Sequence, residues 1–220
     1  MKLKYTITGT GRCGTLNIAR NFTLAGIPCG HESIFDIGGI DTAKKRLNGE
    51  IKIHASGIST EFGNKSVWFD PLLIQADSSY MAAPFLEDEV LRDTIIIHLK
   101  RDPLKVISSF VKNLGYFKTL DNPWEKFIYL HVPTILDFET PLERACEYYI
   151  KWNEMISKHN VVVHKIEDNP NILFEKLNLS RLEKLSNERN FFNNRKEDFQ
   201  IEEIPNKFKE RIYEIYETNS

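Results

Sequence analysis

Residues 3–15, LKYTITGTGRCGT, place a short β-like run directly before a loop with three glycines. We expect a strand over Leu3–Thr8, because tyrosine, threonine and isoleucine favour extended backbone. Leu16–Ala25 then repeats apolar side chains near helical spacing, so a helix is predicted there, and Gly26 ends it. A strand, a glycine loop and a helix in this order predict the opening unit of an α/β fold.

Two later runs rich in β-branched residues predict buried strands, Thr94–Leu99 and Val161–Ile166. Helices are predicted over residues 102–110, with a proline in the first turn, and over Pro141–Lys158. Shorter predicted elements are an edge strand or turn at Ile27–Gly30, a helical piece near Thr42–Asn48 and a strand within Gln75–Phe85. Strands that alternate with helices predict a central parallel β-sheet flanked by helices, with ligands bound where the strands end.

The composition is that of an ordinary globular chain, and its nearly balanced charge argues against ligands that are attracted by a large net charge. With 29 Lys and Arg against 31 Asp and Glu in 220 residues, the formal net charge is −2, so no general attraction to nucleic acid or acidic lipid is expected. Cys13, Cys29 and Cys146 form neither a disulfide framework nor a zinc pattern, which favours a reduced, cytoplasmic setting. No apolar stretch reaches the roughly 18 residues of a transmembrane helix.

The loop GTGRCGT, residues 9–15, has the features of an anion site. Glycines let the backbone approach a ligand closely, and the N–H groups at the start of the following helix point toward an anion. A turn with only a structural role is the simpler alternative. In this strand, loop and helix context we predict phosphate or sulfate binding.

Three known nucleotide or phosphate loops fit the spacing in part. The pattern GxGxxG matches a dinucleotide fingerprint, with Glu32 as a candidate ribose-binding acid. A Walker loop would need lysine after the last glycine, where Thr15 stands. A cysteine phosphatase loop needs five residues between cysteine and arginine, and six separate Cys13 from Arg20. None of the three explains Arg12, which would place a fixed charge and a planar fork beside a bound anion.

A second segment, HLKRDPLKVISSF at residues 98–110, follows the predicted strand Thr94–Leu99. Arg101 stands at the strand end, and Ser109 follows eight residues later, about two turns into the next helix. The two side chains can bind one anion from two sides if the turn between the strand and the helix folds back. Taken alone, the segment is also typical of a salt-bridged helix start.

Together, GRCGT at 11–15 and RDPLKVISS at 101–109 resemble the nucleotide-binding segments of the sulfotransferases that use 3′-phosphoadenosine 5′-phosphosulfate (PAPS). The resemblance spans residues 3–35 and 75–112, and more loosely 145–168. It implies a single domain over residues 1–220 with a three-layer sandwich like that of P-loop NTPases. Most cytosolic members have lysine in the first loop. Arg12 takes that place here, as in several carbohydrate-directed members, so the chain resembles carbohydrate-directed and bacterial members more closely.

The resemblance also implies which residues hold PAPS. The 5′-phosphosulfate would be bound by Gly11, Arg12, Cys13, Gly14, Thr15 and the backbone of Leu16. In the second segment, Arg101 and Ser109 would hold the 3′-phosphate, and Arg12 would stabilise charge on the bridging oxygen. For the family's C-terminal basic loop, Asn194–Lys196 is only a weak counterpart. The implied chemistry requires no metal ion, since placed cations and N–H groups stabilise the charge.

The acceptor hydroxyl must lose a proton as it attacks sulfur, so we expect a base beside the glycine loop. Carbohydrate-directed relatives carry glutamate at about the position of Glu32, and we predict that Glu32 is the base, provided that burial raises its pKa. His31 is the second candidate, because its ordinary pKa already suits the task. The simpler interpretation is that both residues only cap a turn.

The resemblance implies a hydroxyl acceptor on a small molecule or a carbohydrate, glycolipids included, and leaves the oligomeric state open. Two other functions also remain open from the sequence. One is a P-loop nucleotide kinase-like enzyme, which would need Mg²⁺ and prefer ATP. The other is a nucleotide-binding module without catalysis, in which Glu32 does no chemistry.

Other residues could reach the same sheet edge. Residues 77–80, DSSY, either line this edge or form a turn capped by Asp77. Glu167 and Asp168 follow the last strand, with an Asx turn as the simpler interpretation. Most aromatic side chains of residues 114–135 are expected to pack a long loop rather than stack on a sugar. The predicted core also includes Tyr148, Tyr149 and Trp152.

Overall fold

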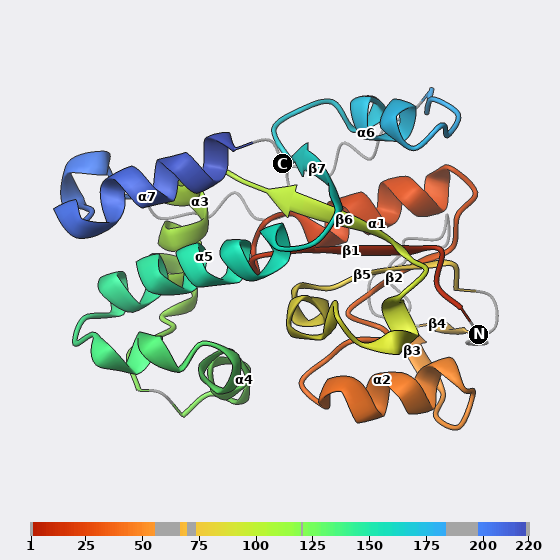
Figure 1. Ribbon diagram of the computed structural model, residues 1–220, viewed down its shortest axis with the longest axis horizontal. Coiled ribbons are helices and arrows are strands. Elements are labelled where there is room, and N and C mark those ends of the chain that lie inside the picture. The colour runs from red at the N-terminus through yellow and green to blue at the C-terminus, as the bar shows by residue number, and fades with distance from the viewer. Residues whose placement is uncertain (1, 56–66, 70–73, 120, 184–197, 219–220) are drawn as a thin grey trace.

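A computed structural model describes residues 2–55, 67–69, 74–119, 121–183 and 198–218. Five parallel strands form a central sheet in the order β2-β5-β1-β6-β7 (Figure 1). The strands are β1 Tyr5–Gly9, β2 Cys29–His31, β5 Ala76–Ser78, β6 Ile95–Lys100 and β7 Val161–Lys165. A separate antiparallel pair consists of β3, Ile53–Ala55, and β4, Val67–Phe69. The predicted parallel sheet is confirmed.

Helices connect the strands close to the predicted positions. The α-helices are α1 Thr15–Leu24, α2 Gly39–Leu47, α3 Pro103–Ser108, α4 Pro123–His131, α5 Pro141–Ser157, α6 Pro170–Lys176 and α7 Asn206–Glu217. Short 3₁₀ turns are η2 Tyr80–Phe85, η3 Glu89–Leu91, η5 Pro133–Asp137 and η6 Ile201–Glu203, and a π-helical turn, η4 Ser109–Leu114, continues α3. Among the described residues, no helix has the length and apolarity needed to cross a bilayer.

The side chains of β1 alternate between two helical layers. Tyr5 and Ile7 face α1 and α6 in one apolar cluster. In that cluster the ring of Phe22 makes edge contacts with Tyr5 and Phe174, at centroid distances of 5.4 and 5.3 Å. Helices α3, α4 and α5 enclose a second cluster on the other face. The sheet is therefore the middle layer of three, as predicted.

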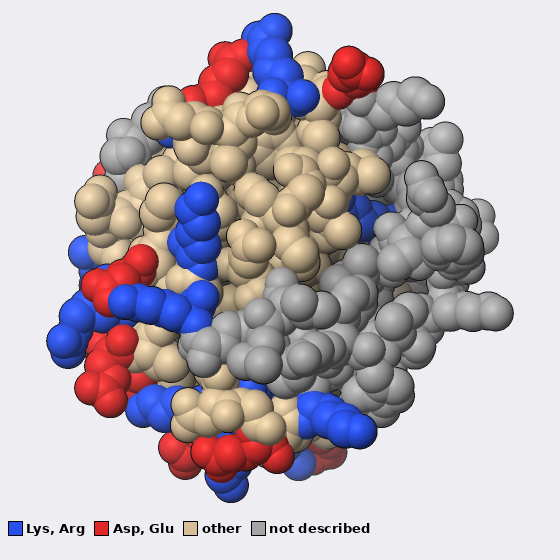
Figure 2. All heavy atoms as spheres, turned by 90° about the vertical axis from the view of Figure 1, so that its right-hand side faces the viewer, with Lys and Arg blue, Asp and Glu red and all other residues tan. Residues whose placement is uncertain are grey.

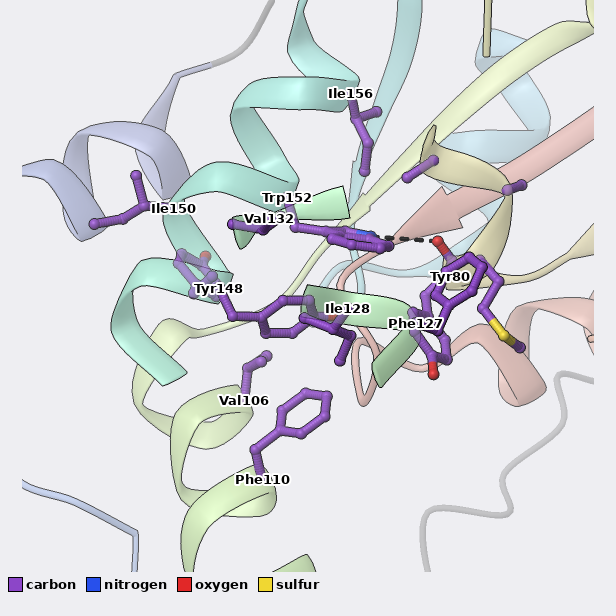
Figure 3. Close-up of a cluster of buried hydrophobic side chains, with 14 of the residues drawn as sticks. Tyr80, Val106, Phe110, Phe127, Ile128, Val132, Tyr148, Ile150, Trp152 and Ile156 are labelled. Carbon is purple, nitrogen blue, oxygen red and sulfur yellow. Dashed lines mark hydrogen bonds between the residues drawn. The ribbon is translucent and has the colours of Figure 1, made fainter. Parts of the chain in front are cut away.

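Helix α5 contributes large aromatic side chains to the second cluster, where they meet residues of η2, α3, η4 and α4 (Figure 3). Trp152 is fully buried, and its indole Nε1 donates to the carbonyl oxygen of Tyr80 at 3.3 Å. The ring of Tyr148 meets that of Phe110 edge-on, with centroids 5.1 Å apart. Buried indole and phenol groups stabilise a core when their polar atoms have partners. The prediction that Tyr148, Tyr149 and Trp152 belong to the core is confirmed.

Strand β7 lies at an edge of the sheet and is only half buried. Val163 and His164 are buried, whereas Val161 and Val162 are partly exposed. The apolar run predicted a fully buried strand. That prediction is wrong for Val161 and Val162, and the predicted buried strand Thr94–Leu99 is wrong at Ile95, which is 40% exposed at the start of β6. The exposed positions are the first residues of their strands, and β7 also has a neighbouring strand on one side only.

The parallel strands all end at one edge of the sheet, toward which the arrow of β6 points in Figure 1. Figure 2 shows the opposite side, where charged side chains lie mainly around the margin and other residue types fill the upper centre. The loops after β1, β2 and β6 gather at the edge where the strands end. All the predicted binding residues in the described part of the chain belong to these loops or to the helices that follow them.

Candidate functional site

The glycine loop joins β1 to α1 through a left-handed glycine at the start of the helix. Gly14 precedes α1 with φ 91° and ψ 21°, a left-handed conformation that favours glycine. Within the described residues, no side chain caps this helix, and its first turn holds no acidic residue. The first N–H groups of a helix have no acceptor inside the helix, so they bind anions readily. The loop has the geometry to receive a phosphate or sulfate group.

Two glycines of this loop have no room for a side chain. A Cβ atom at Gly11 would lie 2.8 Å from Phe110 Cζ, and one at Gly14 would lie 2.6 Å from Ile166 Cγ1. The backbone N–H of Gly11 donates to the hydroxyl oxygen of Tyr148 at 2.8 Å. The loop backbone is therefore fixed against α5 and the turn η4 before any ligand binds.

The two motifs meet at Arg12. Arg12 Nε donates to Ser109 Oγ at 3.0 Å, and Arg101 Nη1 donates to the carbonyl oxygen of Arg12 at 2.7 Å. They are brought together because β1 and β6 are adjacent parallel strands, with Gly9 opposite Leu99. Two guanidinium groups and a serine hydroxyl thus lie in one cluster beside the start of α1.

Both motifs depart from regular backbone at a candidate residue. Arg12 has a φ of 69°, a left-handed conformation that costs a non-glycine residue roughly 1–2 kcal/mol. Ser109 begins the π-helical turn η4, which replaces the regular α-helix predicted through residue 110. Strained backbone and π-helical turns are both frequent at functional sites. Here they occur at the two residues that bond to each other.

Helix α5 braces the second motif as well as the first. Tyr149 OH donates to the carbonyl oxygen of Arg101 at 3.2 Å, and its neighbour Tyr148 holds Gly11. Sequence reasoning assigned both tyrosines to the core alone. The available signal was the presence of two adjacent phenol groups on a buried helix, because a buried hydroxyl usually has a hydrogen-bond partner.

His31 contacts the first residue of α1. Its Nε2 lies 3.0 Å from Thr15 Oγ1, and Ser78 Oγ donates to the carbonyl oxygen of Thr15 at 2.9 Å. Burial, followed by the charges of Arg20 and Arg12, lowers the pKa of His31 to about 4. His31 is therefore neutral at pH 7 and a weak base, but its ring is well placed to orient the hydroxyl of Thr15.

Glu32 lies in the turn directly after β2, beside Arg12. Its φ is 52°, and its backbone N–H donates to the carbonyl oxygen of Ser78 at 3.2 Å. Burial is the largest cause that raises the pKa of Glu32, to about 7, and the charge of Asp77 adds to it while Arg12 opposes it. The carboxyl group can therefore exchange a proton near neutral pH, which a general base requires.

Cys13 and Leu16 contribute to the loop in other ways. Cys13 is fully buried, its N–H donates to the carbonyl oxygen of Thr10 at 3.3 Å, and burial raises the pKa of its thiol to about 12. Such a thiol fills space and is not an activated nucleophile. Leu16 is the second residue of α1, so its backbone N–H belongs to the open first turn.

The remaining candidates have supporting positions. Glu167 Oε1 accepts from the backbone N–H of Asp102 at 3.1 Å, and Asn169 caps α6. Phe117, Phe127 and Tyr129 are buried core residues, so the packing interpretation of residues 114–135 is confirmed for them. Asn194–Lys196 lies outside the described residues.

In the described ranges, no group of three or more His, Cys, Asp or Glu side chains is arranged to hold a metal ion. A scan against protein-family models found no matching family, and a search of curated proteins found no match. The fold and the site define an α/β protein with a glycine loop, two converging arginines and a glutamate of raised pKa.

Proposed function

We propose that the chain is a sulfotransferase that moves the sulfuryl group of PAPS to a hydroxyl, most readily on a carbohydrate or glycolipid. The observation that carries this proposal is the contact of the two predicted binding segments at Arg12, which bonds to both Ser109 and Arg101. PAPS carries two separate anionic groups, the 5′-phosphosulfate and the 3′-phosphate. Two arginines, a serine hydroxyl and the start of α1 lie together, and they supply the positive charge and the hydrogen-bond donors that two anionic groups need.

Each residue of the site has a part in the proposed reaction. Glu32 accepts the proton of the acceptor hydroxyl, the acceptor oxygen bonds to sulfur, and the bond from sulfur to the bridging oxygen breaks. The electron pair of that bond stays on the 5′-phosphate, where Arg12, the hydroxyl of Thr15 and the N–H groups of α1 stabilise it. Arg101 and Ser109 hold the 3′-phosphate. The product nucleotide is 3′,5′-bisphosphoadenosine.

Glu32 is the better base of the two candidates. Its pKa is raised to about 7, whereas that of His31 is lowered to about 4. A base with a pKa near the working pH combines the correct protonation state with sufficient strength. We assign to His31 the orientation of Thr15, to which it is already hydrogen bonded.

The proposal includes a cytoplasmic setting, and the two rival functions fit the site less well. Cys13, Cys29 and Cys146 are unpaired and buried, which agrees with a reducing compartment. A nucleotide kinase-like enzyme is less well supported, because threonine follows Gly14 where a Walker loop has lysine. A binding module without catalysis leaves the raised pKa of Glu32 without a use.

The test is transfer of ³⁵S-labelled sulfuryl from PAPS to a panel of hydroxyl acceptors in the presence of EDTA. We expect labelled product with at least one carbohydrate or glycolipid acceptor, together with release of 3′,5′-bisphosphoadenosine. Transfer of phosphate from γ-labelled ATP that depends on Mg²⁺, with no sulfuryl transfer, would favour the kinase-like rival. Nucleotide binding without turnover on any acceptor would favour the non-catalytic module.

A further inference from the structure

The loop that carries Glu32 is held by a buried carboxylate in the sheet. Asp77, in the centre of β5, has none of its surface exposed. Its Oδ1 accepts from the backbone N–H of Ser33 at 3.1 Å, and its Oδ2 accepts from that of Phe35 at 3.2 Å. A Cβ atom at Gly30, opposite Asp77 on β2, would lie 2.6 Å from Oδ1. One carboxylate therefore holds both ends of a three-residue turn, and the neighbouring strand makes room for it.

The residues after Asp77 hold the same loop. The carbonyl oxygen of Ser78 accepts from the N–H of Glu32 at 3.2 Å. Ser79 Oγ donates to the carbonyl oxygen of Phe35 at 2.8 Å. Glu32 thus lies between fixed points on both sides, in a left-handed conformation that relaxes unless the surroundings enforce it.

We propose that Asp77 is a positioning residue whose carboxylate holds the loop so that Glu32 faces the acceptor site beside Arg12; this inference rests on the proposed function. Residues 77–80 were predicted either to line the site edge or to form a capped turn. Asp77 does not line the edge, because it is completely buried. Its partners are backbone N–H groups of the loop that follows β2, so it acts on the reaction only through Glu32.

Asp77 also acts on Glu32 through its charge. Charged groups that act on Glu32 come from three elements: Asp77 and Asp36 raise its pKa, and Arg12 lowers it. Burial raises the pKa of Asp77 to about 6, while its hydrogen bonds from backbone N–H groups and the charge of Arg46 favour its ionised form. The tyrosines that interact electrostatically with Glu32 remain neutral, because their own pKa values are raised: Tyr80, Tyr116 and Tyr148. His31, next to Glu32, is neutral at the same pH.

The variant Asp77→Asn distinguishes an effect of Asp77 on Glu32 from a role of Asp77 in the stability of the fold. The amide has one acceptor oxygen, so one backbone N–H loses its partner, and the negative charge is removed. We expect kcat to fall about 10- to 100-fold while KM for PAPS changes less than about twofold. The acidic limb of the kcat/KM profile should move to lower pH, because a neighbouring negative charge no longer favours the protonated form of Glu32.

Ser79→Ala is the comparison without a change of charge. It removes the bond to the carbonyl oxygen of Phe35 and the bond that Ser79 Oγ accepts from the N–H of Met81. It should lower kcat and leave the pH limb in place. If Asp77→Asn does not fold, Gly30→Ala tests the same carboxylate, because the added Cβ atom would meet Asp77 Oδ1 at 2.6 Å. Wild-type kcat in Gly30→Ala would overturn the positioning role. A fall in kcat in Asp77→Asn without movement of the limb would equally overturn the electrostatic part.

The titration of Glu32 by carboxyl ¹³C NMR tests the same inference without any reaction. The signal is identified by its loss in Glu32→Gln. We expect an apparent pKa near 7 in the native chain and a lower value in Asp77→Asn. A shifted titration in a chain that transfers no sulfuryl group would refute the proposed function alone. An unshifted titration in an active enzyme would refute the charge effect of Asp77 on Glu32 and would leave the proposed function standing.

Discussion

Replacing Arg101 with alanine is expected to weaken binding of 3′,5′-bisphosphoadenosine about 100-fold, and binding of 5′-AMP less than about threefold. Arg101 Nη1 already donates to the carbonyl oxygen of Arg12, which places its guanidinium group at the loop. Two hydrogen bonds from a cation to the 3′-phosphate account for about 3 kcal/mol, which corresponds to the expected factor. 5′-AMP lacks that phosphate, so it loses only the support that Arg101 gives to the loop.

Isothermal titration calorimetry of the two nucleotides measures this difference. Arg92→Ala is the matched control, because Arg92 is exposed and precedes β6 rather than following it. That variant should bind both nucleotides as the native chain does. If Arg101→Ala weakens both nucleotides equally, Arg101 supports the loop but does not recognise the 3′-phosphate.

Replacing Glu32 with glutamine is expected to lower kcat by about 10² to 10⁴, the range that a general base contributes. Nucleotide affinity should remain within about twofold, because Glu32 faces the acceptor in the proposed reaction and the arginines hold the donor. Binding by calorimetry and initial rates of sulfuryl transfer separate the two effects. Glu87→Gln, at an exposed position, is the control for the loss of one carboxylate. A Glu32→Gln variant with the native kcat would remove Glu32 from the reaction and leave His31 as the candidate.

The pH dependence of the native enzyme follows from the same group. A raised pKa means that the folded protein favours the protonated form of Glu32, which cannot accept a proton. As pH falls through about 7, the fraction of ionised Glu32 falls, and kcat/KM should fall with it. This acidic limb should be absent in Glu32→Gln. With the anionic donor bound, the limb should move to higher pH, since negative charge disfavours ionisation.

The fold and the convergence of the two motifs could be predicted from the sequence, because both depend on local signals. The runs TIII and VVV predicted strands, the glycine loop predicted the turn into α1, and Asp102–Pro103 predicted the start of α3. Parallel strands then bring their ends to one edge whatever lies between them. The pairing of Arg12 with Ser109 follows from that geometry together with the π-helical turn, and the turn itself had no sequence signal.

The supporting residues could not be predicted, because their roles depend on contacts between distant segments. Tyr148 and Tyr149 look like core residues along α5, and only the packed fold shows where their hydroxyl groups point. In the sequence Asp77 looks like the cap of a turn. In the fold its carboxylate accepts a hydrogen bond from the N–H of Ser33, 44 residues earlier in the chain. The role of Glu32 as base requires burial, which raises its pKa. Its raised pKa meets that condition only because the loop is folded against β5.

Calorimetric binding of 3′,5′-bisphosphoadenosine to the native chain in EDTA tests the central claim most directly, that two separate motifs form one site for a doubly phosphorylated nucleotide. The account predicts saturable binding at one site per chain, without Mg²⁺ and at least about 30-fold tighter than binding of 5′-AMP, since the second phosphate adds charge-assisted hydrogen bonds. Absence of binding, equal affinity for the two nucleotides, or a requirement for Mg²⁺ with preference for ATP would contradict it.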